Sequence, residues 1–291
     1  VIYFIGNAFD YIIGFLKFLF IFFSRTSMSN LKAGFINKKA GFSFIVNHLH
    51  KLYNSAVLSI ILKRAYRRYK VENNTFLSCW FDSSALAFCF FKCDKKKNNS
   101  FYTFAHSYEV NPSRNRFVGV NFDKQIVLKV KTVFFISQTI LDLYFDNCII
   151  SSIMKNEKNK FKVRYLGVEN AYDLTYKSSP VFILLSVSSV IELKRIDKII
   201  ECLSSFDKQI KWIHIGDGPL LSRIKELASL KLDPNKNVKY EFLGHLPNNK
   251  VLTFLNDNKI DAFLNVSSVE GISVAIMEAL SFGIPIIATD V

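Results

Sequence analysis

Strand-like and helical segments alternate without interruption from residue 181 to residue 291. Such alternation predicts a parallel, doubly wound sheet, in which each helix crosses from one strand to the next. Ligands of these sheets bind beyond the carboxyl ends of the strands, so the loops after the strands should carry the chemistry. The predicted strands are 181–186, 211–215, 238–243, 260–266 and 285–289, and the predicted helices between them are 196–205, 219–229, 248–257 and 271–282.

The first 168 residues are less regular, but they contain the same kinds of element. Short apolar runs at 100–105, 132–137 and 161–166 predict buried strands of a second parallel sheet. Residues 60–70 predict a basic helix. Residues 169–180 have no apolar periodicity and end in Ser-Ser-Pro, which is typical of a linker. We therefore expect one domain over 1–168, a linker over 169–180 and a second domain over 181–291.

Positive charge is concentrated in the first domain. Residues 1–168 contain 25 lysines and arginines against 9 acidic residues, a net charge of +16, whereas residues 169–291 contain 13 against 15, a net charge of −2. This asymmetry indicates an anionic partner for the first half, either nucleic acid or an anionic membrane surface, or else simply a soluble lysine-rich surface. No recognised nucleic-acid-binding motif combines its basic and aromatic residues, so we expect no nucleic-acid partner.

Membrane-spanning and metal-binding segments are not expected. The most apolar run, 11–23, covers 13 residues and contains Lys17, whereas a spanning helix needs about 20 apolar residues. The five cysteines lack the two-residue spacing of zinc and redox motifs, which is typical of reduced thiols in the cytoplasm. His48 and His50 form an isolated pair that we expect to be surface or helix-capping residues rather than metal ligands.

Cations and glycines follow the first three strands of the second domain. Lys194 and Arg195 lie just before a helix, where a cation could neutralise a diphosphate. The runs Gly216-Asp217-Gly218-Pro219 and Gly244-His245-Leu246-Pro247 indicate tight turns. Each turn could be only a turn, or it could present its backbone to a ligand.

The richest segment, SSVEGISVAIMEA at 267–279, follows the fourth strand. A helix start at this point would offer the amides of Ile272, Ser273 and Val274 to a phosphate. Glu278 stands among apolar neighbours, and a carboxylate there needs polar partners such as two ribose hydroxyls. Alternatively, the helix dipole stabilises Glu270 and a lysine pairs with Glu278.

These motifs resemble the donor-binding domain of glycosyltransferase family 4, which has the GT-B fold. The resemblance rests on HIGDGPL at 214–220, FLGHLPNNKV at 242–251 and SSVEGISVAIMEALSFGIPIIATDV at 267–291. It continues more weakly in FAHSYEV at 104–110, VFFISQTILDLY at 133–144 and VRYLGVEN at 163–170. It implies an α/β protein with two Rossmann-like doubly wound domains facing a cleft, the first of them incomplete and on the acceptor side.

The resemblance also implies roles for individual residues. Glu270 would contact the donor sugar, Glu278 would hold the ribose, and Lys194 would balance the diphosphate as it leaves. His106 would lie at the sugar-transfer centre. The other donor-binding residues would be Gly216, Asp217, Gly218, Leu246, Ile272, Ser273 and Val274. Such enzymes retain the anomeric configuration, take a UDP- or GDP-sugar as substrate and use no metal or further cofactor, and the sequence has no Asp-x-Asp motif.

The sequence departs from the family pattern in two ways. Ser188 and Ser189 stand where the family usually has an arginine. The opening strand and the closing helices of the fold are missing, so we expect a fragment lacking both ends. The resemblance favours a bacterial transferase of surface polysaccharide or lipopolysaccharide synthesis, which would be cytoplasmic and peripheral on the inner face of the membrane. Its acceptor would be a glycan or a lipid-linked sugar. The alternatives are a sugar-nucleotide epimerase of the same fold and an inactive nucleotide-binding fragment.

Overall fold

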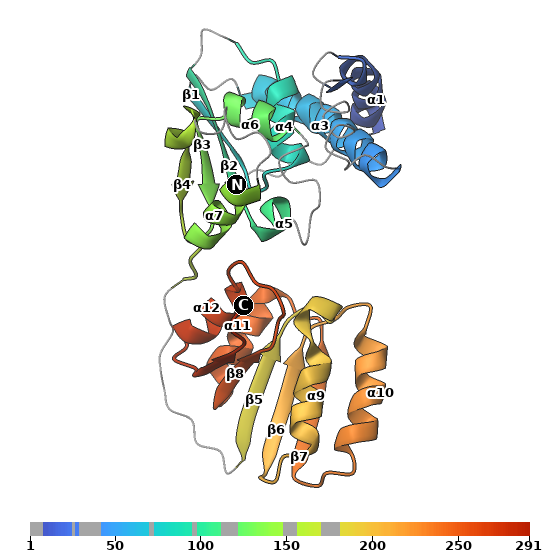
Figure 1. Ribbon diagram of the computed structural model, residues 1–291, viewed down its shortest axis with the longest axis vertical. Helices are drawn as coiled ribbons and strands as arrows, with labels where there is room; N and C mark the ends of the chain where they lie inside the picture. Colours follow the sequence, from blue (N-terminus) through green and yellow to red (C-terminus); the bar gives the residue numbers. More distant parts are fainter. Residues whose placement is uncertain are drawn as a thin grey trace. The chain divides into compact units, whose positions relative to one another are not determined.

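The chain forms two compact units, Val1–Tyr165 and Leu166–Val291, each built around its own parallel sheet (Figure 1). The computed structural model describes residues 8–24, 27–28, 42–69, 73–94, 98–111, 122–147, 156–169 and 181–291. The expected linker at 169–180 therefore lies outside the described residues, except for Glu169.

The C-terminal unit is a five-stranded sheet in the order β7-β6-β5-β8-β9, with every pair of strands parallel. The chain moves outward from β5 to β7 and then returns to the other side of β5, so the order reverses between β5 and β8. That reversal is where sheets of this type bind their ligands. The strands are β5 (Phe182–Val187), β6 (Ile210–Ile215), β7 (Val238–Gly244), β8 (Ala262–Asn265) and β9 (Ile286–Ala288).

Helices cover both faces of this sheet. Alternate residues of a strand point to opposite faces, so Leu184 and Trp212 pack against α9 and α10, while Leu185 and Ile213 pack against α11 and α12. The alternation predicted for the second domain is confirmed, although its last helix begins three residues later than expected. The helices are α9 (Ile196–Ser204), α10 (Leu221–Leu232), α11 (Asn248–Asp257) and α12 (Val274–Ser281), with a short 3-10 turn, η2 (Glu192–Lys194), after β5.

The N-terminal unit has a four-stranded parallel sheet in the order β1-β2-β3-β4. Its strands are β1 (Asn73–Ser78), β2 (Asn98–Ala105), β3 (Thr132–Phe135) and β4 (Phe161–Val163). The three predicted strands of this domain are thereby confirmed. Its helices are α1 (Ala8–Phe22), α3 (Phe42–Tyr69), α4 (Ser83–Phe90), α5 (Ser107–Val110), α6 (Asp123–Lys129) and α7 (Gln138–Asn147), with a 3-10 turn, η1 (Lys158–Lys160).

The long helix α3 connects the outer helices of this unit to its core. It packs on α1 and on α4, and α4 packs on β2 and α6. The predicted basic helix at 60–70 is the last part of α3, except that Lys70 lies outside the described residues. Among the helices of the described ranges, none is both long and apolar enough to cross a bilayer.

Aromatic side chains fill the space between α3, α4 and the sheet. The Phe76 and Phe101 rings stack with their centroids 5.1 Å apart, and Phe88 lies 5.1 Å from Phe101. The expectation that His48 is a surface or helix-capping residue is wrong. Its imidazole is fully buried, stacks on Phe122 at 4.8 Å and has Nε2 2.9 Å from the hydroxyl of Ser27. His50, two residues further along α3, is exposed as expected.

A buried polar cluster lies in the C-terminal sheet. The hydroxyl of Ser186 on β5 accepts a hydrogen bond from Trp212 Nε1 at 2.9 Å and lies 2.8 Å from His214 Nδ1 on β6. Burial lowers the pKa of His214 from 6.5 to about 4, against a smaller opposing effect of the Ser188 backbone. The imidazole is therefore neutral at pH 7, as its buried position requires.

We predict that His214 makes the C-terminal unit less stable in acid. Between pH 6.5 and pH 4 the unfolded chain takes up a proton on His214 that the folded chain does not. The stabilising contribution is therefore complete above about pH 6.5 and is lost as the pH falls towards 4, by about 3 kcal/mol at most. Urea unfolding followed by Trp212 fluorescence in a Trp80→Phe background measures this loss.

His214→Gln removes the titrating group and should flatten the pH dependence in this range. His245→Gln is the matched control, because His245 is exposed in the same unit. An equal acid dependence in the parent and in His214→Gln would contradict the prediction.

Candidate functional site

An open pocket of about 420 Å³ lies in the C-terminal unit at the loops after β5, β6, β7 and β8. Most of the residues predicted from the sequence line it, although their roles remain predictions. They are Lys194, Gly216, Asp217, Leu246, Glu270, Ile272, Ser273, Val274 and Glu278. Ser188, Ser189, His245 and Asn248 are also in its wall. Gly218 is not among the lining residues, and His106 belongs to the other unit.

Glu270 is fixed in the pocket by three donors. Lys194 Nζ at 2.5 Å, the Ser267 hydroxyl at 2.8 Å and Asn265 Nδ2 at 3.2 Å all donate to its Oε1. Burial alone would raise the pKa of Glu270, but these hydrogen bonds and the Lys194 charge together outweigh burial and lower it. The site therefore contains an ionised carboxylate and an ammonium group in contact, both about one-fifth exposed.

The two adjacent cations, Lys194 and Arg195, have different tasks. Arg195 has a left-handed backbone conformation with φ of 47°, and its guanidinium donates to the carbonyl oxygens of Val266 at 2.7 Å and Ser267 at 3.2 Å. This ties the loop after β5 to the loop after β8. Of the two candidate phosphate cations, only Lys194 lines the pocket.

The glycines of the Gly216-Asp217-Gly218 turn allow two loops to touch. A Cβ on Gly216 would lie 1.8 Å from the Ser188 carbonyl oxygen, and a Cβ on Gly218 would lie 2.5 Å from that of Val190. The amide of Val190 in turn donates to the Asp217 carbonyl at 2.9 Å. The turn therefore also packs against the loop after β5. Gly218 does not line the pocket, but its lack of a side chain allows this packing.

Glu278 is buried in α12, with 8% of its surface exposed. Asn248 Nδ2, at the start of α11, donates to its Oε1 at 2.8 Å. The alternative in which a lysine pairs with Glu278 is thus not what the structure shows. Asn248 was missed in the sequence because an asparagine at a helix start is usually explained as a cap.

The start of α12 lies at the pocket, but later than predicted. Ser273 is the N-cap residue and Val274 is the first helical residue, so Ile272 precedes the helix. Asn265 Nδ2 donates to the Ser273 hydroxyl at 3.2 Å as well as to Glu270. Asn265 therefore couples the helix start to the carboxylate, a role that sequence analysis missed because the residue lies within a predicted strand.

His106 lies at the carboxyl end of β2 in the N-terminal unit and caps α5. Its amide donates to Glu109 Oε2 at 3.1 Å, and Glu109 Oε1 accepts the amide of Phe81 at 3.1 Å. The imidazole packs against Trp80, with ring centroids 4.5 Å apart, and is about one-fifth exposed. Its predicted place at the transfer centre stays a prediction.

Within the ranges that the structure describes, no three His, Cys, Asp or Glu side chains converge as a metal-ligand set. What the C-terminal pocket does offer is a fixed ion pair, a buried carboxylate and the start of a helix. These groups suit a polar ligand with anionic and hydroxyl parts. Residues 175–291 match the family model described as Glycosyl transferases group 1. The pocket lies within the segment that matches this family model.

Solved glycosyltransferase structures share the fold of the chain. They include a mutant of TarM from S. aureus with Fondaparinux, alpha-GlcNAc-glycerol and UDP (TM-score 0.55, 17% identity, 81% of this chain and 45% of that chain). The pneumococcal O-GlcNAc transferase GtfA with UDP and GlcNAc has a TM-score of 0.58 and 12% sequence identity. The match covers 80% of this chain and 45% of GtfA. HepE from Anabaena with UDP and glucose has a TM-score of 0.53 and 18% sequence identity. The match covers 79% of this chain and 62% of HepE.

At these identities the likeness shows the fold, and it confirms the predicted GT-B class with two Rossmann-like domains. The chain spans about half the length of these solved proteins. Among curated proteins, none matches its sequence.

We predict that Gly216→Ala disrupts the pocket of the C-terminal unit. The new Cβ would overlap the Ser188 carbonyl, and the backbone φ of 152° is unfavourable for alanine. The expected loss of unfolding free energy is about 3 kcal/mol. Urea unfolding of the two proteins measures it.

Gly167→Ala is the control, because nothing lies within 4 Å of a Cβ built there. It should change stability by no more than about 0.5 kcal/mol. Equal stabilities for the two variants would show that the loops do not need this close approach.

Proposed function

We propose that the chain transfers a sugar from a nucleotide sugar to a glycan or lipid-linked acceptor, with retention and without a metal ion. The observation that carries this proposal is the Lys194–Glu270 ion pair in the pocket of a glycosyl transferase group 1 domain. Membership of family 4 and a role in surface polysaccharide synthesis belong to the same proposal and rest on the sequence motifs.

In this mechanism the bond between the anomeric carbon and the diphosphate breaks, and the acceptor hydroxyl oxygen bonds to that carbon on the same face. The proton of the acceptor hydroxyl passes to the departing diphosphate oxygen. Negative charge grows on the leaving diphosphate. Lys194 and the amides at the start of α12 stabilise that charge without rearranging, because the fold already fixes them. Glu270 hydrogen-bonds the hydroxyls of the donor sugar, and His106 contributes from the acceptor side.

Glu278 holds the ribose. A carboxylate accepts about four hydrogen bonds, and Asn248 supplies one of them. Two ribose hydroxyls would satisfy the remaining capacity of a buried group that is costly to leave unpaired. The nucleotide in the TarM, GtfA and HepE complexes is UDP, which makes UDP the first nucleotide to test.

We predict that the chain binds UDP in the presence of EDTA, and that Glu278→Gln weakens this binding by about tenfold or more because a charged acceptor is lost. Calorimetry gives the affinities. Glu226→Gln is the control, since Glu226 is exposed on α10 and outside the pocket.

Uridine separates the two proposed roles. Lys194→Met should weaken binding of UDP but not of uridine, because uridine carries no phosphate, whereas Glu278→Gln should weaken both. Equal effects of Lys194→Met on the two ligands would contradict the role of Lys194. Given a UDP-sugar, an epimerase would form the epimeric UDP-sugar, a transferase would extend an acceptor, and an inactive fragment would bind UDP without either product.

A surface in the N-terminal unit supports the membrane part of the proposal. Helix α1 exposes Ile12, Leu16 and Phe20, the last of them at 84%. The end of α3 exposes Lys63, Arg67 and Arg68, and Arg64 ties the two helices together through Asp10 at 2.6 Å. An apolar helix face near a basic cluster is typical of proteins that lie on anionic lipid. On this proposal the protein works at the cytoplasmic face of the membrane.

We predict that the chain sediments with vesicles of phosphatidylglycerol and phosphatidylcholine at low salt. Phe20→Glu should reduce binding by about tenfold, because an exposed aromatic ring that would insert into the bilayer is replaced by a negative charge. Leu230→Glu is the matched control, since Leu230 is 74% exposed on α10 of the other unit. Equal sedimentation of the two variants, or none for the parent, would contradict the membrane proposal.

A further inference from the structure

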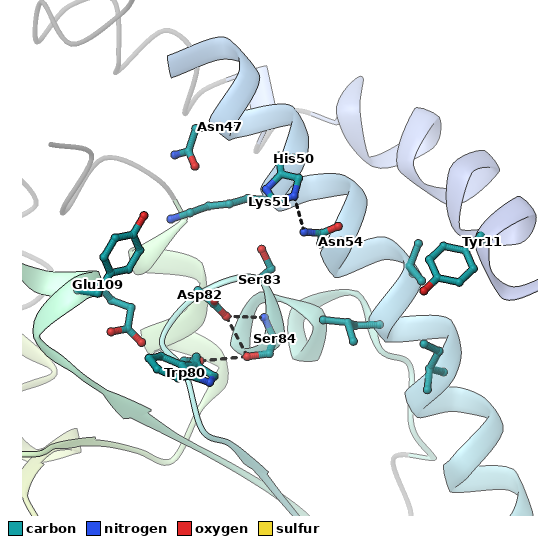
Figure 2. A pocket seen from close by; sticks show the side chains of 14 residues that line it. Tyr11, Asn47, His50, Lys51, Asn54, Trp80, Asp82, Ser83, Ser84 and Glu109 are labelled. Atoms are coloured by element: carbon teal, nitrogen blue, oxygen red, sulfur yellow. Dashed lines mark hydrogen bonds between the residues drawn. The ribbon is translucent and has the colours of Figure 1, made fainter. Parts of the chain in front are cut away.

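A second pocket, of about 720 Å³, lies wholly within the N-terminal unit (Figure 2). One wall is the middle of α3, and the facing wall is the loop between β1 and α4 together with the start of α5. The proposed donor site does not involve this pocket, and of the sequence motifs only FAHSYEV at 104–110 reaches it, through Tyr108 and Glu109.

Two exposed aromatic rings form part of the facing wall. Trp80 is 49% exposed and Tyr108 is 56% exposed, and both line the pocket. Trp80 is held firmly by its backbone, because its carbonyl oxygen accepts hydrogen bonds from the hydroxyls of Ser78 at 2.7 Å and Thr103 at 3.1 Å. A large aromatic surface left open to solvent in a concave, fixed setting is typical of a ligand site.

The opposite wall offers polar groups. Asn47, Lys51 and Asn54 recur at the helical spacing of four and three residues, so they share one face of α3. All three line the pocket. In Figure 2 the Lys51 side chain extends away from α3, whereas Asn54 lies beside His50, with its Nδ2 3.0 Å from His50 Nε2. Amide groups both donate and accept hydrogen bonds, the ammonium donates and the carboxylate accepts. Together these groups can bind hydroxyls, which themselves donate and accept.

The charges in the pocket argue against a phosphate ligand. Lys51 and His50 are its only basic lining residues in the described ranges, and Asp82 and Glu109 are its acidic ones there. Glu109 is buried and its two oxygens hold the amides of Phe81 and His106. With the charges nearly balanced, the pocket fits an uncharged ligand that has one apolar face and many hydroxyls. A pyranose ring has both.

We propose that this pocket binds a sugar ring of the acceptor glycan, with Trp80 against the C–H face of the ring and Asn47, Lys51 and Asn54 on its hydroxyls. Trp80 also packs on His106 at 4.5 Å, so the bound ring lies beside the histidine proposed for the transfer centre. That the sugar belongs to an acceptor rests on the proposed function, whereas the binding of the sugar does not.

The chain contains only two tryptophans, and they make the test direct. Trp80 is half exposed and Trp212 is fully buried. Iodide should therefore quench Trp80 and leave Trp212 bright, which the Trp80→Phe variant verifies. The probes are the methyl glycosides of glucose, galactose and N-acetylglucosamine, and lactose and maltose. The expected result is that at least one probe protects Trp80 of the full chain from iodide, with no nucleotide present.

Substitutions then test the contacts. Asn54→Ala should weaken the protecting probe by about tenfold, the loss expected for hydrogen bonds in a buried polar site. In calorimetry Trp80→Ala should weaken it at least as much, and Phe20→Ala, which removes an exposed aromatic ring of the same unit outside the pocket, should not. None of these variants should change the affinity for UDP.

The outcomes separate this inference from the proposed function. The sugar site is overturned if no probe protects Trp80 from iodide. It is also overturned if both Trp80→Ala and Asn54→Ala bind the probe as tightly as the parent. Either result counts even if UDP binds normally. Protection of Trp80 in a chain that does not bind UDP supports the sugar site and counts against the donor site.

Discussion

The pocket of the C-terminal unit depends on how Arg195 ties the loop after β5 to the loop after β8. These two strands are neighbours in the sheet but lie far apart in the sequence, and the strand order reverses between them. Arg195 binds the carbonyls of Val266 and Ser267, and the Ser268 amide donates to the Leu193 carbonyl at 2.8 Å. With the two loops fixed, Lys194 is brought to Glu270, 76 positions later in the sequence. The left-handed Arg195 thus positions the ion pair without touching the pocket itself.

The sequence predicted the C-terminal unit well because its signals are local. Each strand is a short apolar run and each helix has clear ends, so neighbouring residues alone define Asn248–Asp257 as a helix. The pocket was predictable too, because parallel strands bring their carboxyl ends to one edge of the sheet. The division of work between Lys194 and Arg195 could not be predicted, since it depends on backbone conformation and on partners more than 70 residues away.

The N-terminal unit was harder to predict because its signals are long-range. Helix α3 has apolar and polar residues on every side, and its N-terminal part was not recognised. His48 contacts Ser27 and Phe122, which lie on segments distant from it in the sequence, so its burial could not be predicted from its neighbours along the chain. The pocket between α3 and Trp80 likewise joins segments about 30 residues apart. No spacing of residues predicts such a pocket, because it exists only once α3 packs on α4.

Three buried or half-buried carboxylates differ in how much of their hydrogen-bonding capacity the protein uses, and this difference indicates their roles. Both oxygens of Glu109 bind backbone amides, so its task is to hold the loop of Trp80 and the start of α5. Glu270 receives three donors on one oxygen, and these hydrogen bonds together with the Lys194 charge lower its pKa and fix its position. Glu278 is buried with Asn248 as its donor among the described residues, and it therefore has the largest remaining capacity. A buried carboxylate in that condition is stabilised most by a ligand that brings donors in pairs, as the two hydroxyls of a ribose do.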